Sequence, residues 1–144
     1  MSDKSSTASR GMVVAPHALA ARSGLAVLRE GGNAIEAMVA AAATISVVYP
    51  HMNGIGGDSF WLIHAPGRAV TTIDACGRAA GRATRDFYRE RNVSAIPMRG
   101  PLAANTVAGT LSGWKPDRLW KCGLSTSPTA AARSVAFGGS SQVT

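Results

Sequence analysis

The stretch GGNAIEAMVAAAATISVVYPHMNGIGGD, residues 31–58, decides how this chain folds. It joins a pair of helix-ending glycines, a second helix of small and apolar residues, and a glycine-rich loop. Asn33 can accept a hydrogen bond from the backbone N–H of Glu36, while the Glu36 side chain reaches back to the N–H of Asn33. This capping box predicts a helix that begins at Ala34 and runs to about Val48.

The predicted helix over residues 34–48 carries no charge after Glu36. A helix that is apolar on every side is normally buried on every side, so we expect it to be the central helix of the domain. Its last turns leave an alternative open, because the β-branched residues between Thr44 and Val48 would also suit a buried strand. Pro50 breaks the pattern in either case.

The residues before this stretch predict a short strand followed by a helix. We interpret the apolar run at residues 12–15 as a buried strand that ends at Pro16. Leu25 and Leu28 are three apart, which is the spacing of a half-buried helix. The glycine pair that begins at Gly31 ends this helix, because glycine adopts the left-handed conformation without a steric penalty.

The residues after the glycine loop predict a β-hairpin. Residues 59–65 and 69–74 are rich in β-branched and aromatic side chains, which is typical of strands. Pro66 and Gly67 between them supply the restricted φ and the flexible φ that a turn needs. Further along, we expect a helix entered near Thr84 within residues 82–92, and mostly loop over residues 100–114.

Two segments in order carry a family resemblance. PHMNGIGGD, residues 50–58, resembles the PHxxGIGGG segment of gamma-glutamyltransferases (gamma-glutamyltranspeptidases), and it stands at the family's distance after GGNAIEA. The resemblance extends over residues 11–114, from GMVVAPHALAARSGLAVLREGGNA through DSFWLIHAPGRAVTTID. The family is an N-terminal-nucleophile hydrolase family. The resemblance therefore implies an α+β fold, the incomplete N-terminal portion of an αββα sandwich in the large subunit.

The resemblance also implies a reaction for the whole enzyme. Members transfer a gamma-glutamyl group from glutathione or a related amide to an amino acid or to water, through an acyl-threonine intermediate. That threonine becomes an N-terminus when the precursor cuts itself. Here Thr144 ends the chain, and no threonine is followed by the family's Thr-His. We expect a fragment without a catalytic residue of its own, inactive alone, with the gamma-glutamyl substrate bound only by the full-length enzyme.

One arginine is a candidate for substrate binding. The family's large subunit holds the substrate α-carboxylate with an arginine placed just before an ATRD-like stretch, and here that region reads IDACGRAAGRATRDF, residues 73–87. Cys76 occupies the arginine position, and Arg78 follows two residues later. A guanidinium can bind a carboxylate through two hydrogen bonds, whereas a thiol cannot. Arg78 is therefore the candidate, with a structural or simply exposed arginine as the alternative. The GRAA pattern resembles the gamma-glutamyltransferase-like and cephalosporin-acylase-like branch, whose acyl-group specificity is open.

Other chemistry has little support in the sequence. The glycine loop at residues 53–58 follows a helix and enters a strand, the reverse of a dinucleotide fingerprint, so we interpret it as structural instead of phosphate-binding. No metal, cofactor or acid–base pair is expected from the histidines and aspartates, whose spacing suggests no site. A cysteine-dependent acylase is a remote alternative. The histidines, aspartates and cysteines concerned are His17, His51, His64, Asp58, Asp74, Asp86, Cys76 and Cys122.

Charge and hydropathy restrict the partners. The net charge is +7, but the twelve arginines are spread along the chain without a dense cluster, so we expect no nucleic-acid partner. The longest apolar tract, residues 37–49, is too short to cross a bilayer, so no membrane partner is expected either. Residues 1–10 contain no apolar run of the kind that a signal peptide needs, and we expect a cytoplasmic protein.

The chain divides into three parts by composition. Residues 1–10 predict a flexible N-terminus, residues 11–114 the partial gamma-glutamyltransferase-like domain, and residues 115–144 a divergent, disordered tail. The tail follows no family pattern, which indicates a frameshift or premature end, or else a genuine disordered segment. An alternative function is an interaction module that associates with a separately encoded remainder of the fold, the missing-subunit partner.

Overall fold

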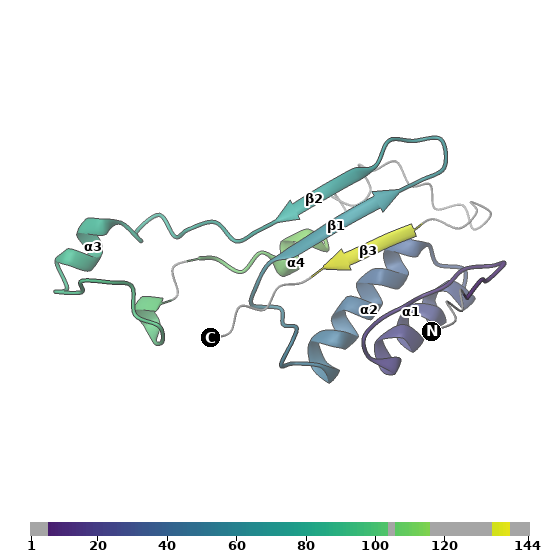
Figure 1. Ribbon diagram of the computed structural model, residues 1–144, viewed down its shortest axis with the longest axis horizontal. Helices are drawn as coiled ribbons and strands as arrows, with labels where there is room; N and C mark the ends of the chain where they lie inside the picture. Colours follow the sequence, from purple (N-terminus) through teal and green to yellow (C-terminus); the bar gives the residue numbers. More distant parts are fainter. Residues whose placement is uncertain (1–5, 104–105, 116–133, 139–144) are drawn as a thin grey trace, which may run out of the picture.

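The computed structural model describes residues 6–103, 106–115 and 134–138. Two long helices lie beside a small sheet, and a long excursion carries a further short helix away from them (Figure 1). We call this excursion, residues 81–103, the arginine arm. The elements are α1 (Ala18–Arg29), α2 (Ala34–Val48), β1 (Ser59–His64), β2 (Thr71–Ala75), α3 (Arg85–Arg89), the 3-10 turn η1 (Pro101–Ala103), α4 (Thr110–Gly113) and β3 (Ser134–Gly138).

Helix α1 is bounded by residues that satisfy its free backbone groups. His17 caps its start, where the ring Nδ1 accepts a hydrogen bond from the N–H of Leu19 at 3.2 Å. At its end, Gly31 adopts a φ of +92° and the N–H of Gly32 donates to the carbonyl oxygen of Val27 at 2.9 Å. The glycine pair therefore ends the helix as predicted, because only glycine takes a positive φ without strain.

Helix α2 begins with the predicted capping box. The side-chain oxygen of Asn33 accepts from the N–H groups of Ile35 at 2.9 Å and Glu36 at 3.0 Å. The Glu36 carboxylate in turn accepts from the N–H of Asn33 at 2.8 Å. The helix continues to Val48, so the β-branched residues at its end are helical and the strand alternative is wrong.

The two helices touch where their side chains are smallest. Gly24 of α1 faces Ala37 of α2 so closely that a Cβ at Gly24 would lie 2.7 Å from the Ala37 carbonyl oxygen. Ala20 and Ala41 are buried. Close approach of the two backbones maximises dispersion contacts between the helices, although each contact is weak. The alanine-rich composition of this region is therefore explained by helix-on-helix packing.

The sheet has the strand order β2-β1-β3, and both neighbours of β1 run antiparallel to it. Strands β1 and β2 form the predicted hairpin, with Trp61 opposite Ile73. In the turn, Arg68 donates its N–H to the Ala65 carbonyl at 3.0 Å, and Gly67 takes a φ of +72°. The Pro66–Gly67 turn prediction is confirmed.

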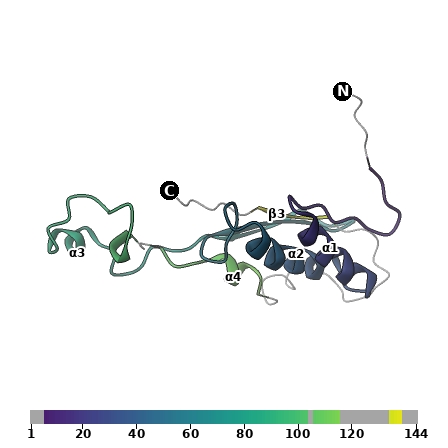
Figure 2. The same ribbon diagram turned by 90° about the horizontal axis from the view of Figure 1, so that it is seen from below.

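The core lies on one face of the sheet. Residues of β1 alternate strictly between buried and exposed, and α1, α2 and α4 all lie on the buried side (Figure 2). Helices gathered on one face of an antiparallel sheet make an α+β arrangement, as predicted. The described residues supply one helical layer and one sheet. The cluster contains Ile35, Trp61, Ile63, Ala65 and Ile73, with Met38, Val39 and Trp114 packed against it.

Two expectations about burial were wrong. Residues 12–15 form no strand, and Met12 and Val14 are exposed, because the described residues place no strand edge beside them. Helix α2 is not buried all round, since Val47 on its outer side is 77% exposed. Within the described residues, only α1 and the sheet cover α2, so one of its faces stays open.

The tail also differs from expectation at five residues. We expected little stable structure after residue 114, yet β3 pairs with β1 from Phe60 opposite Gly138 to His64 opposite Ser134. The physical reason is the free edge of β1, whose unpaired N–H and C=O groups are a template for another strand. Residues 116–133 and 139–144, which include Cys122, lie outside the described residues.

Candidate functional site

The glycine loop after α2 is tied to the start of α4 by backbone hydrogen bonds. The Gly57 carbonyl oxygen accepts from the N–H groups of both Gly109 and Thr110, each at 2.9 Å. The Thr110 hydroxyl donates to the Asp58 carbonyl oxygen at 3.2 Å. Ser59, fully buried, donates its hydroxyl to the Thr110 carbonyl at 3.2 Å. The loop therefore forms a structural junction with the start of α4, and its Gly57 carbonyl oxygen is hydrogen-bonded within the chain.

Asp58 links this junction to the end of β2. Its carboxylate accepts a hydrogen bond from the N–H of Gly77 at 2.6 Å. On the other side, the N–H of Val107 donates to the carbonyl of Arg78 at 2.9 Å, and Ala79 forms an isolated bridge with Thr106. Three segments thus meet here through backbone groups. We call them the backbone crossing, residues 57–59, 75–79 and 106–110.

Glycine is required at two points of the backbone crossing. A Cβ at Gly77 would collide with the carbonyl oxygen of Val107. A Cβ at Gly109 would collide with the carbonyl oxygen of Ala75. Glycine in such positions allows two backbones to come closer than any side chain permits. The crossing is therefore held at fixed geometry, and with it the residues that flank Gly77.

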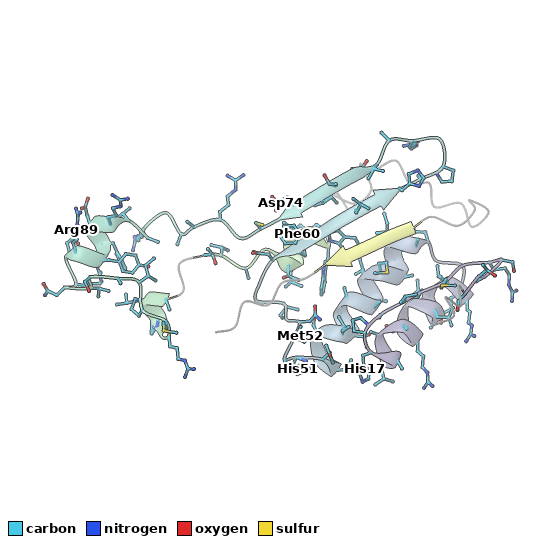
Figure 3. All side chains as sticks on the ribbon, viewed as in Figure 1. His17, His51, Met52, Phe60, Asp74 and Arg89 are labelled. Atoms are coloured by element: carbon cyan, nitrogen blue, oxygen red, sulfur yellow. The ribbon has the colours of Figure 1, made fainter. Side chains whose placement is uncertain are left out.

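Cys76 and Asp74 form an exposed hydrogen-bonded pair beside the crossing. The Asp74 carboxylate, at the end of β2 (Figure 3), accepts the N–H of Cys76 at 2.9 Å. Hydrogen bonding by the thiol and the N–H of Cys76 lowers the pKa of Asp74. The same thiol–carboxylate bond, with local desolvation and the charges of Asp74 and Asp58, raises the pKa of Cys76 to about 11. A nucleophilic cysteine acts as the thiolate, so this environment opposes a Cys76-dependent acylase.

Arg78, the predicted substrate-binding residue, lies in the backbone crossing with its side chain exposed. The carbonyl oxygen of Arg78 accepts a hydrogen bond from the N–H of Val107, and the N–H of the neighbouring Gly77 donates to the Asp58 carboxylate. The guanidinium therefore extends from a backbone that is fixed on both sides. A side chain on such a base loses less freedom on binding a ligand than one on a loose loop.

The other candidates are scattered. His17 caps α1, the ring of His51 lies 4.2 Å from that of Tyr49, and Asp86 pairs with Arg89 at 3.3 Å on the arginine arm. Figure 3 places His17 and His51 by the helix pair, far from Arg89. In the part of the chain that the structure describes, no three His, Cys, Asp or Glu side chains form a group able to hold a metal ion.

Sequence reasoning missed the part played by residues 106–113. They were expected to be mostly loop, but the buried Thr110 and the close-packed Gly109 make them one side of the crossing. The signal available was small: a glycine directly before a threonine that begins a short helix. None of the described helices is long and apolar enough to cross a membrane.

The fold and the backbone crossing identify the structural class of this chain, and the comparisons with known proteins identify its family. A helical layer on an antiparallel sheet, entered by a glycine loop, corresponds to part of the N-terminal-nucleophile hydrolase sandwich. The crystal structure of Helicobacter pylori gamma-glutamyltranspeptidase is similar to 83% of this chain, with a TM-score of 0.67 and 30% identity, over 34% of that chain. Residues 20–119 match the family Gamma-glutamyltranspeptidase, and the chain belongs to that family.

Two curated relatives narrow the branch. The oxamate amidohydrolase proenzyme of Klebsiella pneumoniae subsp. pneumoniae is 61% identical over 110 residues, which are 76% of this chain and 20% of that protein. The glutathione hydrolase-like YwrD proenzyme of Bacillus subtilis is 47% identical over 113 residues, 78% of this chain and 21% of that protein. The chain spans about a fifth of the length of these relatives, and so corresponds to a fragment of such an enzyme.

Proposed function

We propose that this chain is the first part of the large subunit of an amide-hydrolysing enzyme, and that Arg78 binds the carboxylate of its substrate. The main support is that the backbone of Arg78 is fixed while its side chain is exposed. Val107 hydrogen-bonds to the Arg78 carbonyl oxygen, and the neighbouring Gly77 hydrogen-bonds to Asp58. A planar guanidinium binds a carboxylate through two parallel, charge-assisted hydrogen bonds. The substrate class that follows is an amide whose acyl group carries a carboxylate.

Two substrates belong to this class. A gamma-glutamyl amide such as glutathione carries an α-carboxylate on its acyl group. Oxamate, after which the Klebsiella relative is named, carries a carboxylate directly on its amide carbon. Arg78 follows Cys76 by two residues, so the carboxylate that it holds lies at a different place from one held at position 76. The higher identity to the oxamate amidohydrolase, 61% against 47% for the glutathione hydrolase-like relative, supports the shorter acyl group, and we propose oxamate-like amides ahead of gamma-glutamyl amides.

The reaction itself belongs to the completed protein. Hydrolysis or acyl transfer in this family needs an N-terminal threonine, which we expect in a part of the enzyme outside these 144 residues. The free face of the sheet supports the same proposal, because Phe60 is 40% and Leu62 51% exposed on it. A second sheet packed there would remove that apolar surface from water. The chain alone is accordingly proposed to be inactive.

A chimera tests the proposal. Residues 11–114 replace the homologous segment of the Klebsiella oxamate amidohydrolase, and hydrolysis of oxamate and of a gamma-glutamyl anilide is measured. We expect the chimera to mature and hydrolyse oxamate, and the 144-residue chain alone to hydrolyse neither compound. Activity of the chain alone would contradict the proposal, as would a chimera that matures but remains inactive.

Arg78 is tested in the same chimera. Arg78→Gln should raise the KM for oxamate about 10- to 100-fold, since a hydrogen bond to a charged group contributes about 1.5–3 kcal/mol. Arg78→Lys keeps the charge but not the planar guanidinium, so its KM for oxamate should lie between those of the unaltered chimera and Arg78→Gln. The matched control is Arg22→Gln, an exposed arginine on α1. Equal KM values for Arg78→Gln and the control would remove Arg78 from the site.

The second proposal is an interaction module that associates with a separately encoded remainder of the fold. The exposed Phe60 and Leu62 favour it, because an apolar sheet face is a surface for another chain. Co-expression of this chain with the homologous remainder of the Klebsiella enzyme tests it. A co-purifying, active pair supports the module. Activity only when the two parts are one polypeptide contradicts it.

A further inference from the structure

The arginine arm, residues 81–103, stands apart from the rest of the molecule. It leaves the sheet after the backbone crossing and returns to the same place before α4 (Figure 1). Figure 3 shows Arg89 on the arm far from His17 and His51 at the helix pair. Among the described residues, α3 packs extensively against no other helix or strand. Helix α3 of the arm therefore adds little packing to the body that carries it.

The arm nevertheless has a defined internal structure. Thr84 caps α3 by accepting the N–H of Phe87 at 3.2 Å. Tyr88 is buried within the arm, and its hydroxyl donates to the Leu102 carbonyl oxygen at 3.1 Å. The N–H of Val93 donates back to the Tyr88 carbonyl at 3.0 Å. These bonds preform the arm, which lowers the entropy lost when it binds a partner.

The surface of the arm combines positive charge with apolar side chains. It carries five arginines against two carboxylates, and Arg89 and Arg91 lie near those carboxylates in ion pairs of 3.3 and 4.0 Å. Arg82, Arg85 and Arg99 are exposed and have no ion pair with a carboxylate of the described residues. Between the charges, Ile96 is 50% and Met98 81% exposed.

We propose that the arginine arm is a docking element for an acidic, partly apolar surface of the polypeptide that completes this enzyme. This inference rests on the proposed function, because it requires the remaining four fifths of a family enzyme. Arg82, Arg85 and Arg99 would supply the ionic contacts, and Ile96 and Met98 the apolar centre. The arm and Arg78 share one base, the backbone crossing, so docking of the arm also holds the crossing against the completed enzyme.

Charge and composition favour this partner over the other candidates. A second copy of the chain, itself at +7, would be repelled by the arm. A nucleic acid would be attracted by the arginines, but Ile96 and Met98 offer it neither an ionic contact nor a ring on which to stack. A protein surface with carboxylates around an apolar patch uses both kinds of side chain.

The test compares one triple variant in two contexts. Arg82→Gln/Arg85→Gln/Arg99→Gln removes three charges without touching Thr84 or Tyr88. Its control, Arg22→Gln/Arg29→Gln/Arg68→Gln, removes three exposed charges on α1 and in the turn between β1 and β2. In the chimera we expect the arm variant to inactivate on heating roughly tenfold faster than the control, and the difference to shrink in high salt. In the 144-residue chain, the two variants should unfold alike.

Each possible result either supports or overturns the docking role of the arginine arm. Equal inactivation of the two variants in an active chimera overturns the docking element and leaves the proposed function standing. A chimera with the native arm that fails to mature or hydrolyse oxamate counts against the proposed function, and the docking element falls with it. Binding of a labelled single-stranded DNA to the chain at physiological salt, lost in the arm variant and kept in the control, would replace the protein partner with a nucleic acid.

Discussion

The helix–sheet body and the backbone crossing are held together in opposite ways. In the body, bulky side chains such as Trp61 and Ile63 are removed from water between the sheet and α2. In the crossing, Gly77 and Gly109 bring main chains together with no side chain between them. The body is thus stabilised chiefly by the hydrophobic effect, whereas the crossing depends on hydrogen bonds and on the absence of Cβ atoms.

This difference has a functional consequence. A side-chain core tolerates swaps that conserve volume, because neighbouring side chains can shift. Two backbones in contact cannot shift without breaking the hydrogen bonds on both sides. The crossing is therefore the more rigid base, and it is the crossing that carries Cys76, Arg78 and the start of the arginine arm. Substitutions in the two regions should differ in size and in what they affect.

The largest effect is expected at the crossing. Gly77→Ala places a methyl group against the Val107 carbonyl, which must break the Asp58 and Val107 hydrogen bonds around it. We expect a loss of more than about 3 kcal/mol in the free energy of unfolding, measured by urea titration. Gly81→Ala is the control, since nothing lies within 4 Å of its Cβ. Similar midpoints for the two variants would refute the close-approach account.

Two adjacent residues of β1 allow a buried and an exposed position of the body to be compared. Ile63 is 2% exposed in the core and Leu62 is 51% exposed on the open face. Ile63→Ala should cost about 2–5 kcal/mol of unfolding free energy, because it leaves a cavity. Leu62→Ala should cost under about 1 kcal/mol in the isolated chain. In the chimera, Leu62→Ala should cost more, and an unchanged small cost there would argue against a second sheet on that face.

A smaller effect is expected at the start of α2. Asn33→Ala removes the acceptor for the N–H groups of Ile35 and Glu36, and should lower stability by about 1 kcal/mol. Asn33→Asp keeps an acceptor at the same place and should stay near the wild type. Thermal unfolding followed by circular dichroism compares the two. Equal losses in both variants would show that the cap is not the source of the effect.

The smallest effect expected is the change in stability when pH titrates Cys76 and Asp74 beside the backbone crossing. Because the pKa of Cys76 is raised to about 11, its stabilising contribution is present below the ordinary thiol pKa of 9.0 and is lost as pH rises toward 11. Asp74, whose pKa is lowered, contributes above its ordinary pKa of 3.8, and that contribution is lost on further acidification. Both groups are exposed, so the changes in stability should be slight.

Alkylation measures the same pair directly. In a Cys122→Ser background, the rate of Cys76 alkylation by iodoacetamide should rise with an inflection near 11. Asp74→Asn removes the carboxylate and should move the inflection down toward the ordinary thiol value. The control is Asp86→Asn on α3, which lies on the arginine arm. An inflection near 9 in the unaltered pair would contradict the hydrogen bond between Asp74 and the thiol.

Local features were predictable because local residues decide them. The capping box at Asn33, the Pro66–Gly67 turn and the Thr84 entry to α3 each depend on residues within one turn of chain, and each is confirmed. The burial of α2 was not predictable in the same way. Its composition is apolar all round, whereas the described residues cover only some of its faces, so Val47 stays exposed.

The sequence by itself determined helices α1, α2 and α3, the hairpin and the family, because capping, turn chemistry and motif order are written in adjacent residues. Only the tertiary structure decided that Gly57, Gly77 and Gly109 meet, since they are far apart in the chain and glycine carries no pattern of its own. It also decided that the Asp58 carboxylate is engaged by a backbone N–H and that Arg78 extends from a fixed base. Long-range backbone contacts leave almost no periodic signal, which is why they appear only in three dimensions.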